Sequence, residues 1–293
     1  MSDRPIKAHD ADRPIGVFDS GIGGLSVLNA LQAELPHERF VYFADTAHAP
    51  YGERGDDYVA ARTRAVTRCL IDVHDIKAMV VACNTATAAA IHLLRVAHGA
   101  LPLVGVEPAL KPAVVISRTR RIAVLATRGT LASAKFRALH ASLSAQADFS
   151  LVSCDGLAAA VEADDVASIA LLCARYTAAA GTFGTATGEL DTLVLGCTHY
   201  PFVAQRLRAF TGTEVHYIDT GVPVAQQTRR LLAASHQLAT SRTVDMAEGT
   251  EAAGTTLLLS SGDPSQLDAA ASRWLLRPAS PATLFSTAAR ATA

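Results

Sequence analysis

Short apolar runs alternate with longer segments in which apolar and polar residues recur at helical spacing. In the first half of the chain, the apolar runs at residues 15–18, 40–43 and 78–82 predict buried strands, and a helical segment follows each of them. Strands that alternate with helices in this way typically form a parallel sheet covered by helices on both faces. The hydrophobic pattern therefore predicts an α/β fold.

The second half of the chain restarts the same pattern. Residues 122–125 predict a strand, and a turn and a helix through residues 136–139 follow it, as a turn and a helix follow residues 15–18. The apolar run that ends at Gly196 likewise matches the run that ends at Ala82. We therefore expect two similar doubly wound parallel-sheet domains, consistent with an ancient duplication.

Proline residues mark the expected domain limits. Pro108 and Pro112 punctuate the passage between the halves, and Pro223 follows the end of the second half. The strand predicted at residues 255–259 and the helix after it are too few to form a domain, so we expect them to pack onto the first one. The predicted division is a first domain of residues 14–109 and 219–276, a second domain of residues 110–218, and tails at residues 1–13 and 277–293.

Composition argues against several classes of function. The 293 residues carry 26 Lys and Arg against 27 Asp and Glu, so no overall field favours nucleic acid or an anionic membrane. Residues 1–13 lack the apolar core of an export signal, and no segment has the length and apolarity of a membrane span, so we expect a cytoplasmic protein. The five cysteines are widely spaced without a Cys-x-x-Cys pair, so we expect reduced thiols and no metal site.

Two of the apolar runs end alike. Cys83 and Cys197 each follow such a run, and each is followed by two polar residues and then a helical segment. The N–H groups at a helix start stabilise a thiolate, so this setting predicts a pKa lowered toward neutrality for both thiols. Either cysteine alone is explained as a small buried apolar residue. The matched pair instead predicts two proton carriers, with His199 placed to assist Cys197.

A glycine-rich turn follows the first strand and has two interpretations. Residues 19–24 nearly match the dinucleotide-binding fingerprint, with Asp45 in the place of a ribose-binding acid. However, Ser26 occupies the third glycine position, and Asp19 would face the pyrophosphate. Asp19 is better suited to an ammonium group or to tuning the basicity of a nearby thiol.

Six motifs resemble the cofactor-independent aspartate/glutamate racemase family, and glutamate racemases in particular. They are Phe18-Asp19-Ser20-Gly21-x-Gly23-Gly24, Pro50-Tyr51-Gly52, Ala82-Cys83-Asn84-Thr85, Gly105-Val106-Glu107-Pro108, Ala126-Thr127-x-Gly129-Thr130 and Gly196-Cys197-Thr198-His199-Tyr200-Pro201. The resemblance extends from Ile15 to about Leu276. It implies interconversion of L-glutamate and D-glutamate in a cleft between the two domains, without a cofactor. It also implies a homodimer that supplies D-glutamate for peptidoglycan synthesis.

The resemblance further implies the roles of particular residues. Cys83 would take the Cα proton from D-glutamate and Cys197 would take it from L-glutamate, with Asp19 assisting Cys83 and His199 assisting Cys197. The implied substrate contacts are Asp19, Ser20, Tyr51, Gly52, Asn84, Thr85, Glu162, Thr198 and His199.

Two of these contacts have a weak local signal. Taken alone, Tyr51 belongs to an ordinary turn, and Glu162 is a solvated residue of a helical segment at residues 158–176. The run at residues 154–157 also departs from the family, with Cys-Asp-Gly-Leu where Cys-Pro-Leu-Phe is common.

Three other functions remain open from the sequence. An aspartate racemase of the same family would share the motifs and differ mainly in the length of the cleft. A two-lobed binding protein without catalytic activity would have no need of two matched thiols. A hydrolase that used Cys197 and His199 would leave Cys83 without a role.

Overall fold

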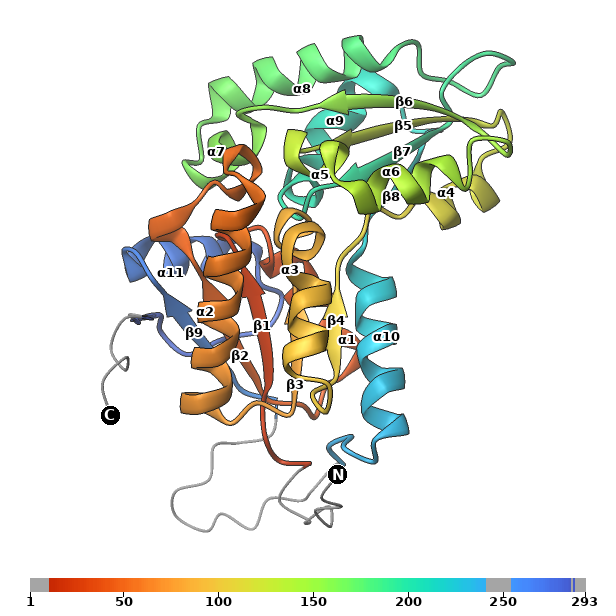
Figure 1. The fold of residues 1–293 in the computed structure, drawn as a ribbon. Helices are drawn as coiled ribbons and strands as arrows, with labels where there is room; N and C mark the ends of the chain where they lie inside the picture. Colours follow the sequence, from red (N-terminus) through yellow and green to blue (C-terminus); the bar gives the residue numbers. More distant parts are fainter. Residues whose placement is uncertain (1–10, 241–253, 286, 288–293) are drawn as a thin grey trace.

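The computed structural model describes residues 11–240, 254–285 and 287, which form two parallel β-sheets flanked by helices (Figure 1). The first sheet has the strand order β10-β9-β2-β1-β3-β4, and the second has the order β6-β5-β7-β8. The predicted α/β fold with two parallel sheets is confirmed, although the sheets differ in size, with six strands in the first and four in the second.

The first unit consists of the larger sheet and its helices. Its strands are β1 (Ile15–Asp19), β2 (Phe40–Ala44), β3 (Ala78–Val81), β4 (Leu103–Gly105), β9 (Thr256–Ser260) and β10 (Thr283–Leu284). Its helices are α1 (Leu25–Glu34), α2 (Asp56–His74), α3 (Asn84–Ala97), α10 (Gly221–Ala234) and α11 (Pro264–Trp274). Successive strand residues point to opposite faces, so Val17 lies in the apolar layer with α1, α10 and α11, and Phe18 in the layer with α2 and α3.

The second unit consists of the smaller sheet and its helices. Its strands are β5 (Arg121–Ala126), β6 (Asp148–Ser153), β7 (Thr192–Gly196) and β8 (His216–Ile218). Its helices are α4 (Leu110–Ile116), α5 (Arg128–Ala132), α6 (Ala134–Ala141), α7 (Leu157–Glu162), α8 (Val166–Ala180) and α9 (Ala204–Thr211). Helices α4 and α6 pack on one face of the sheet, and α7, α8 and α9 on the other.

In the described part of the chain, three short 3-10 helices lie between strands and helices. They are η2 (Thr46–His48), η3 (Tyr51–Glu53) and η4 (Tyr200–Val203). The first two lie between β2 and α2, and the third follows β7. No helix among the described residues combines the length and the apolar character needed to cross a membrane.

The last part of the chain returns to the first sheet. β9 pairs with β2, placing Thr256 opposite Phe40. The chain continues into β10, within residues that the sequence assigned to a tail, and the N–H of Phe285 donates to the carbonyl of Ser260 at 2.8 Å. A strand of two residues has no periodicity, so the hydrophobic pattern gave no sign of it.

The helical segment expected at residues 158–176 is divided into α7 and α8. Asp164 between them adopts a left-handed φ of 52°, and Asp165 begins α8 by accepting a hydrogen bond from the N–H of Ser168 at 3.0 Å. This break makes Glu162 the last residue of a short helix rather than a residue in the middle of a long one.

Candidate active site

The carboxyl ends of strands from both sheets meet at one pocket between the two units. β1 ends at Asp19, β3 ends shortly before Cys83, and β7 ends directly before Cys197. This edge of a parallel sheet is where α/β proteins bind ligands. The pocket is lined by Ser20, Ala49, Pro50, Tyr51, Gly52, Cys83, Asn84, Thr85, Thr127, Ala158, Glu162, Cys197, Thr198 and His199.

The structure thus brings together residues that lie far apart in the sequence. Of the eleven site residues that the sequence analysis named, only Asp19 is missing from this lining, and it lies directly before Ser20. Thr127 and Ala158 line the pocket although the sequence analysis gave them no site role. The signal for Thr127 was its place after β5, which corresponds to the end of β1 in the repeated pattern.

Cys83 lies at the start of α3 and is buried. Its sulfur accepts a hydrogen bond from the N–H of Ala86 at 3.5 Å, and its thiol donates to Oγ of Ser20 at 3.7 Å. Burial nevertheless raises the pKa of the Cys83 thiol far above its ordinary value, and the charge of Asp19 raises it further. The lowered pKa predicted for Cys83 is therefore wrong, because desolvation outweighs the helix N–H group.

Asp19 is completely buried beside this thiol. Its Oδ2 accepts a hydrogen bond from the N–H of Gly24 at 2.7 Å, whereas its Oδ1 has no hydrogen-bond partner among the described residues. Burial raises the pKa of Asp19 to about 6, and the charge of His199 partly opposes this effect. Near neutral pH the carboxylate is thus an anion that makes Cys83 a stronger base.

Cys197 has a different partner, the imidazole of His199. The sulfur lies 3.6 Å from Nδ1 of His199, and Nε2 of the same ring lies 2.5 Å from Oε1 of Glu162. Burial alone would lower the pKa of His199, but hydrogen bonds with Cys197 and Glu162, together with their charges, hold that pKa well above its usual 6.5. The protonated ring has an N–H at both nitrogens, so it presents a cationic donor to Cys197.

Glu162 connects the two units across the pocket. Besides its bond with His199, Oε1 accepts a hydrogen bond from the N–H of Ile22 at 2.8 Å. The glycine-rich turn makes this approach possible, because a Cβ atom on Gly21 would lie 1.9 Å from Oε1 of Glu162, and one on Gly23 would lie 2.4 Å from Nδ1 of His199. Glu162 is therefore not the solvated helix residue that its local sequence suggests.

Polar groups suited to a charged ligand surround the two sulfurs. Asn84 is buried, and neither atom of its amide has a hydrogen-bond partner among the described residues. Oγ1 of Thr85 lies 3.1 Å from Oγ1 of Thr127 on the opposite unit. Buried amides and hydroxyls without complete hydrogen bonding are costly, so they mark where a polar ligand would bind.

Tyr51 and Gly52 line the pocket without offering it a free polar side-chain group. The Tyr51 hydroxyl donates to Oδ2 of Asp45 at 2.5 Å, so it is occupied by a protein group. Gly52 packs against Thr127, to which a Cβ on Gly52 would approach within 3.0 Å. Asp45, considered above as a ribose-binding acid, also pairs with Arg62. Within the described residues, no three His, Cys, Asp or Glu side chains are grouped so as to hold a metal ion.

Known proteins are similar to this chain in sequence and in fold. The Asp/Glu/Hydantoin racemase family matches residues 23–228. A glutamate racemase of Methylococcus capsulatus is 47% identical over 242 residues, which cover 82% of this chain and 85% of that protein.

Two solved structures superimpose over nearly the whole chain. Glutamate racemase isoform RacE1 of Bacillus anthracis has a TM-score of 0.78 and 28% identity, covering 94% of this chain and 97% of that one. The Escherichia coli glutamate racemase in complex with L-glutamate and the activator UDP-MurNAc-Ala has a TM-score of 0.74 and 25% identity, covering 91% and 97%. From its sequence matches, the chain belongs to the Asp/Glu/Hydantoin racemase family.

Proposed function

We propose that this protein interconverts L-glutamate and D-glutamate by moving the Cα proton between Cys83 and Cys197, without a cofactor. The observation that carries the proposal is that the two thiols line one pocket from different sheets. Inversion at Cα requires a proton to leave one face and another to arrive at the opposite face. Two separate acid–base groups supply that directly.

The reaction is balanced by the two sulfurs alone. With L-glutamate bound, the Cys197 thiolate takes the Cα proton, and its electron pair stays on carbon as a carbanion. The Cys83 thiol then gives its proton to the opposite face, which leaves D-glutamate, a thiol at Cys197 and a thiolate at Cys83. The reverse reaction begins from that state, so Cys83 acts on D-glutamate and Cys197 on L-glutamate.

The neighbours of the thiols supply the electrostatics of each step. His199, held by Glu162, directs its N–H toward Cys197 and stabilises negative charge on that sulfur. Asp19 increases the basicity of Cys83 through its own charge. The Cα–H bond is a very weak acid, so the pocket must also position the substrate and stabilise the carbanion by hydrogen bonding.

Substrate binding is assigned to polar residues of the pocket lining and to Asp19, which directly precedes Ser20 of that lining. Ser20, Asn84, Thr85 and Thr198 offer hydroxyl and amide groups to the α-carboxylate, and the unpartnered Oδ1 of Asp19 suits the ammonium group. Tyr51 and Gly52 contribute through the wall they form, because the Tyr51 hydroxyl is bound to Asp45. This set contains the donors and the acceptor that an amino acid needs.

The substrate is assigned to glutamate because the matched relatives bear that name and the Escherichia coli structure holds L-glutamate. We further propose a cytoplasmic homodimer that supplies D-glutamate for peptidoglycan synthesis. An aspartate racemase is the second candidate, because the shared family also includes enzymes for that shorter substrate.

The test is circular dichroism of L-glutamate and D-glutamate incubated separately with the purified protein in deuterium oxide, without added cofactor. We expect both signals to decay to zero while solvent deuterium appears at Cα. L-aspartate, treated in the same way, is the matched control for substrate length. Unchanged glutamate signals would overturn the proposal, and decay with aspartate alone would assign the second candidate.

A further inference from the structure

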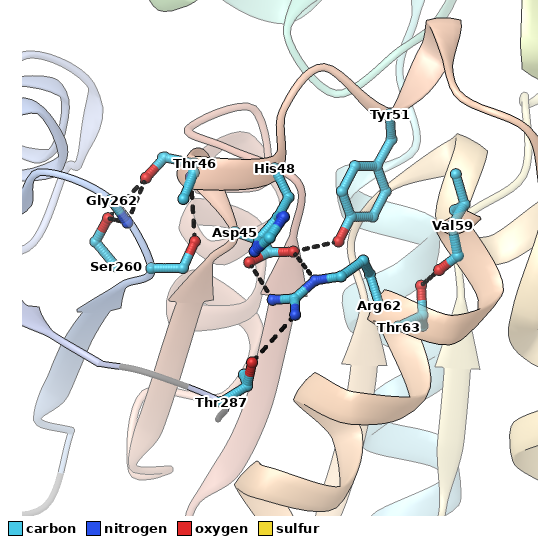
Figure 2. A network of polar contacts seen from close by, with 12 residues as sticks. Asp45, Thr46, His48, Tyr51, Val59, Arg62, Thr63, Ser260, Gly262 and Thr287 are labelled. Atoms are coloured by element: carbon cyan, nitrogen blue, oxygen red, sulfur yellow. Dashed lines mark hydrogen bonds and ion pairs between the residues drawn. The ribbon is translucent and has the colours of Figure 1, made fainter. Parts of the chain in front are cut away.

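An ion pair between the buried Asp45 and the partly buried Arg62 lies behind the pocket wall, at the carboxyl end of β2. Asp45 is completely buried, and its Oδ1 accepts a hydrogen bond from Nη2 of Arg62 at 2.8 Å. Its Oδ2 accepts from Nε of Arg62 at 3.0 Å and from the Tyr51 hydroxyl at 2.5 Å (Figure 2). Asp45 and Arg62 are both outside the pocket lining, whereas Tyr51 is part of it. The network therefore reaches the site through one aromatic residue.

The two-point geometry of Arg62 fixes the position of that aromatic residue. A guanidinium that donates two hydrogen bonds to one carboxylate leaves the carboxylate little freedom to rotate. The Tyr51 hydroxyl stays protonated, because burial and the charge of Asp45 raise its pKa. Tyr51 is thus a permanent donor to an acceptor whose orientation Arg62 sets.

Movement of Tyr51 would be transmitted to the opposite unit. Tyr51 begins η3, and the next residue, Gly52, packs against Thr127 of the second unit. Thr127 in turn lies within hydrogen-bond distance of Thr85 in the pocket. A shift of the Tyr51 ring would therefore move Gly52 relative to Thr127 and change the distance between the two units at the pocket wall.

The end of the described chain supports Arg62 from outside. Nη1 of Arg62 donates to Oγ1 of Thr287 at 3.2 Å. Earlier in the chain, β10 pairs with β9, and the ring centroid of Phe285 lies 6.3 Å from that of Phe43. Figure 2 shows Arg62 between Asp45 and Thr287, with one edge of its guanidinium toward each.

We propose that Arg62 is a positioning residue for the racemisation, acting through Asp45 on Tyr51 and on the wall formed by residues 50–52. The inference rests on the proposed function. Arg62 touches neither the thiols nor the pocket, so its effect is on how the substrate is held rather than on proton transfer itself.

A second ion pair on the same sheet, buried on both sides, provides a control. Lys77 pairs with Glu38 just before β3 and β2 begin. This pair therefore lies at the amino ends of the strands, whereas the pocket lies at their carboxyl ends. Lys77 also donates to the carbonyls of Ala11 and Gln237. Loss of either pair leaves a buried charge uncompensated and lowers stability, but only the Arg62 pair leads to the pocket.

The experiment measures kcat and KM in both directions, together with the melting temperature, for Arg62→Met, Arg62→Lys, Tyr51→Phe and Lys77→Met. We expect Arg62→Met to raise KM for both enantiomers and to lower kcat/KM by about 10- to 100-fold, as displaced positioning groups do. Arg62→Lys should recover part of the loss, and Tyr51→Phe should cost less than Arg62→Met. Lys77→Met should lower the melting temperature and leave the kinetics of the folded protein unchanged.

Two outcomes would overturn this proposal. One is a KM equal to that of the wild-type protein in both Arg62→Met and Tyr51→Phe. The other is a loss of kcat/KM in Lys77→Met as large as that in Arg62→Met. If Arg62→Met does not fold, Arg62→Lys and Tyr51→Phe decide in its place. Binding of D-glutamate is measured by calorimetry on the same variants, so the positioning role is tested even if the wild-type protein shows no turnover. An inactive wild-type protein would refute the proposed function alone.

Discussion

Cys83 and Cys197 occupy equivalent strand ends in the two units but have opposite electrostatic surroundings. Cys83 lies beside the buried carboxylate of Asp19, and burial together with that charge raises its pKa. Cys197 faces His199, which Glu162 helps to keep protonated. One sulfur therefore has an anion as its neighbour, and the other has a cation.

The difference shows that a repeated backbone position does not by itself determine the protonation state of its side chain. Both cysteines precede helical turns, the setting from which the sequence predicts a lowered pKa at both places. The surrounding side chains differ: the charge of Asp19 raises the pKa of Cys83, whereas Cys197 faces the imidazole of His199, whose own pKa is raised. The two strand ends therefore give their thiols different partners, an anion at Cys83 and a cationic donor at Cys197.

The largest expected effect comes from breaking the pair itself. Cys83→Ser and Cys197→Ser should each lower racemisation by about 10⁴-fold, the upper end of what one acid–base group contributes. Cys83→Ser should still exchange the Cα proton of L-glutamate with deuterium, because Cys197 takes and returns a proton on one face. Mass spectrometry and circular dichroism of the same sample separate exchange from inversion.

The same substitution at a cysteine outside the pocket is the control for this prediction. Cys69→Ser, on α2 and away from the pocket lining, should racemise as the wild-type protein does. Substantial inversion in either active-site variant would contradict the assignment of two opposed bases.

The next effect comes from separating Glu162 from His199, the cation beside Cys197. Gly21→Ala places a Cβ atom 1.9 Å from Oε1 of Glu162, which must then move away from Ile22 and His199. We expect kcat/KM to fall by about 100-fold, as displacement of a positioned group does. The fall should be equal in both directions, because the enantiomers have equal free energy.

Gly55→Ala is the matched glycine control, because an added Cβ meets no atom within 4 Å there. It should leave kcat/KM unchanged in a steady-state assay. A Gly21→Ala variant with normal activity would show that the Glu162 contact has no part in catalysis.

Some of these features could be predicted from the sequence alone, and others could not. The fold class followed from alternating apolar runs, and the two thiols followed from their matched surroundings, because both signals are local. The contact of Glu162 with Ile22 could not be predicted, since it depends on the break after α7 and on the packing of one unit against the other. The pKa of Cys83 was predicted in the wrong direction, because burial is a property of the assembled pocket rather than of the helix start.

The protonation of Asp19 should make the activity of the protein depend on pH, because its charge acts on Cys83. Its pKa of about 6 means that the carboxylate is charged above that pH and neutral below it. As the pH falls through this value, Cys83 loses the neighbour that increases its basicity, so kcat/KM of the wild-type protein should decrease. Asp19→Asn should lack this acidic limb and lower kcat/KM at pH 8 by about 10-fold, one pKa unit of base strength. A profile of Asp19→Asn that kept the limb would assign it to another group.

The smallest expected effect concerns the weak hydrogen bond between Cys83 and Ser20. The thiol donates to Oγ of Ser20 at 3.7 Å, so Ser20→Ala removes one contact to Cys83 and leaves the Asp19 charge in place. One ordinary hydrogen bond is worth about 1 kcal/mol, so kcat/KM should fall by about 5-fold. Ser142→Ala, on an exposed turn after α6, is the matched control. The proposed contact of Ser20 with the α-carboxylate should add a rise in KM to this loss, and an unchanged KM would contradict that contact.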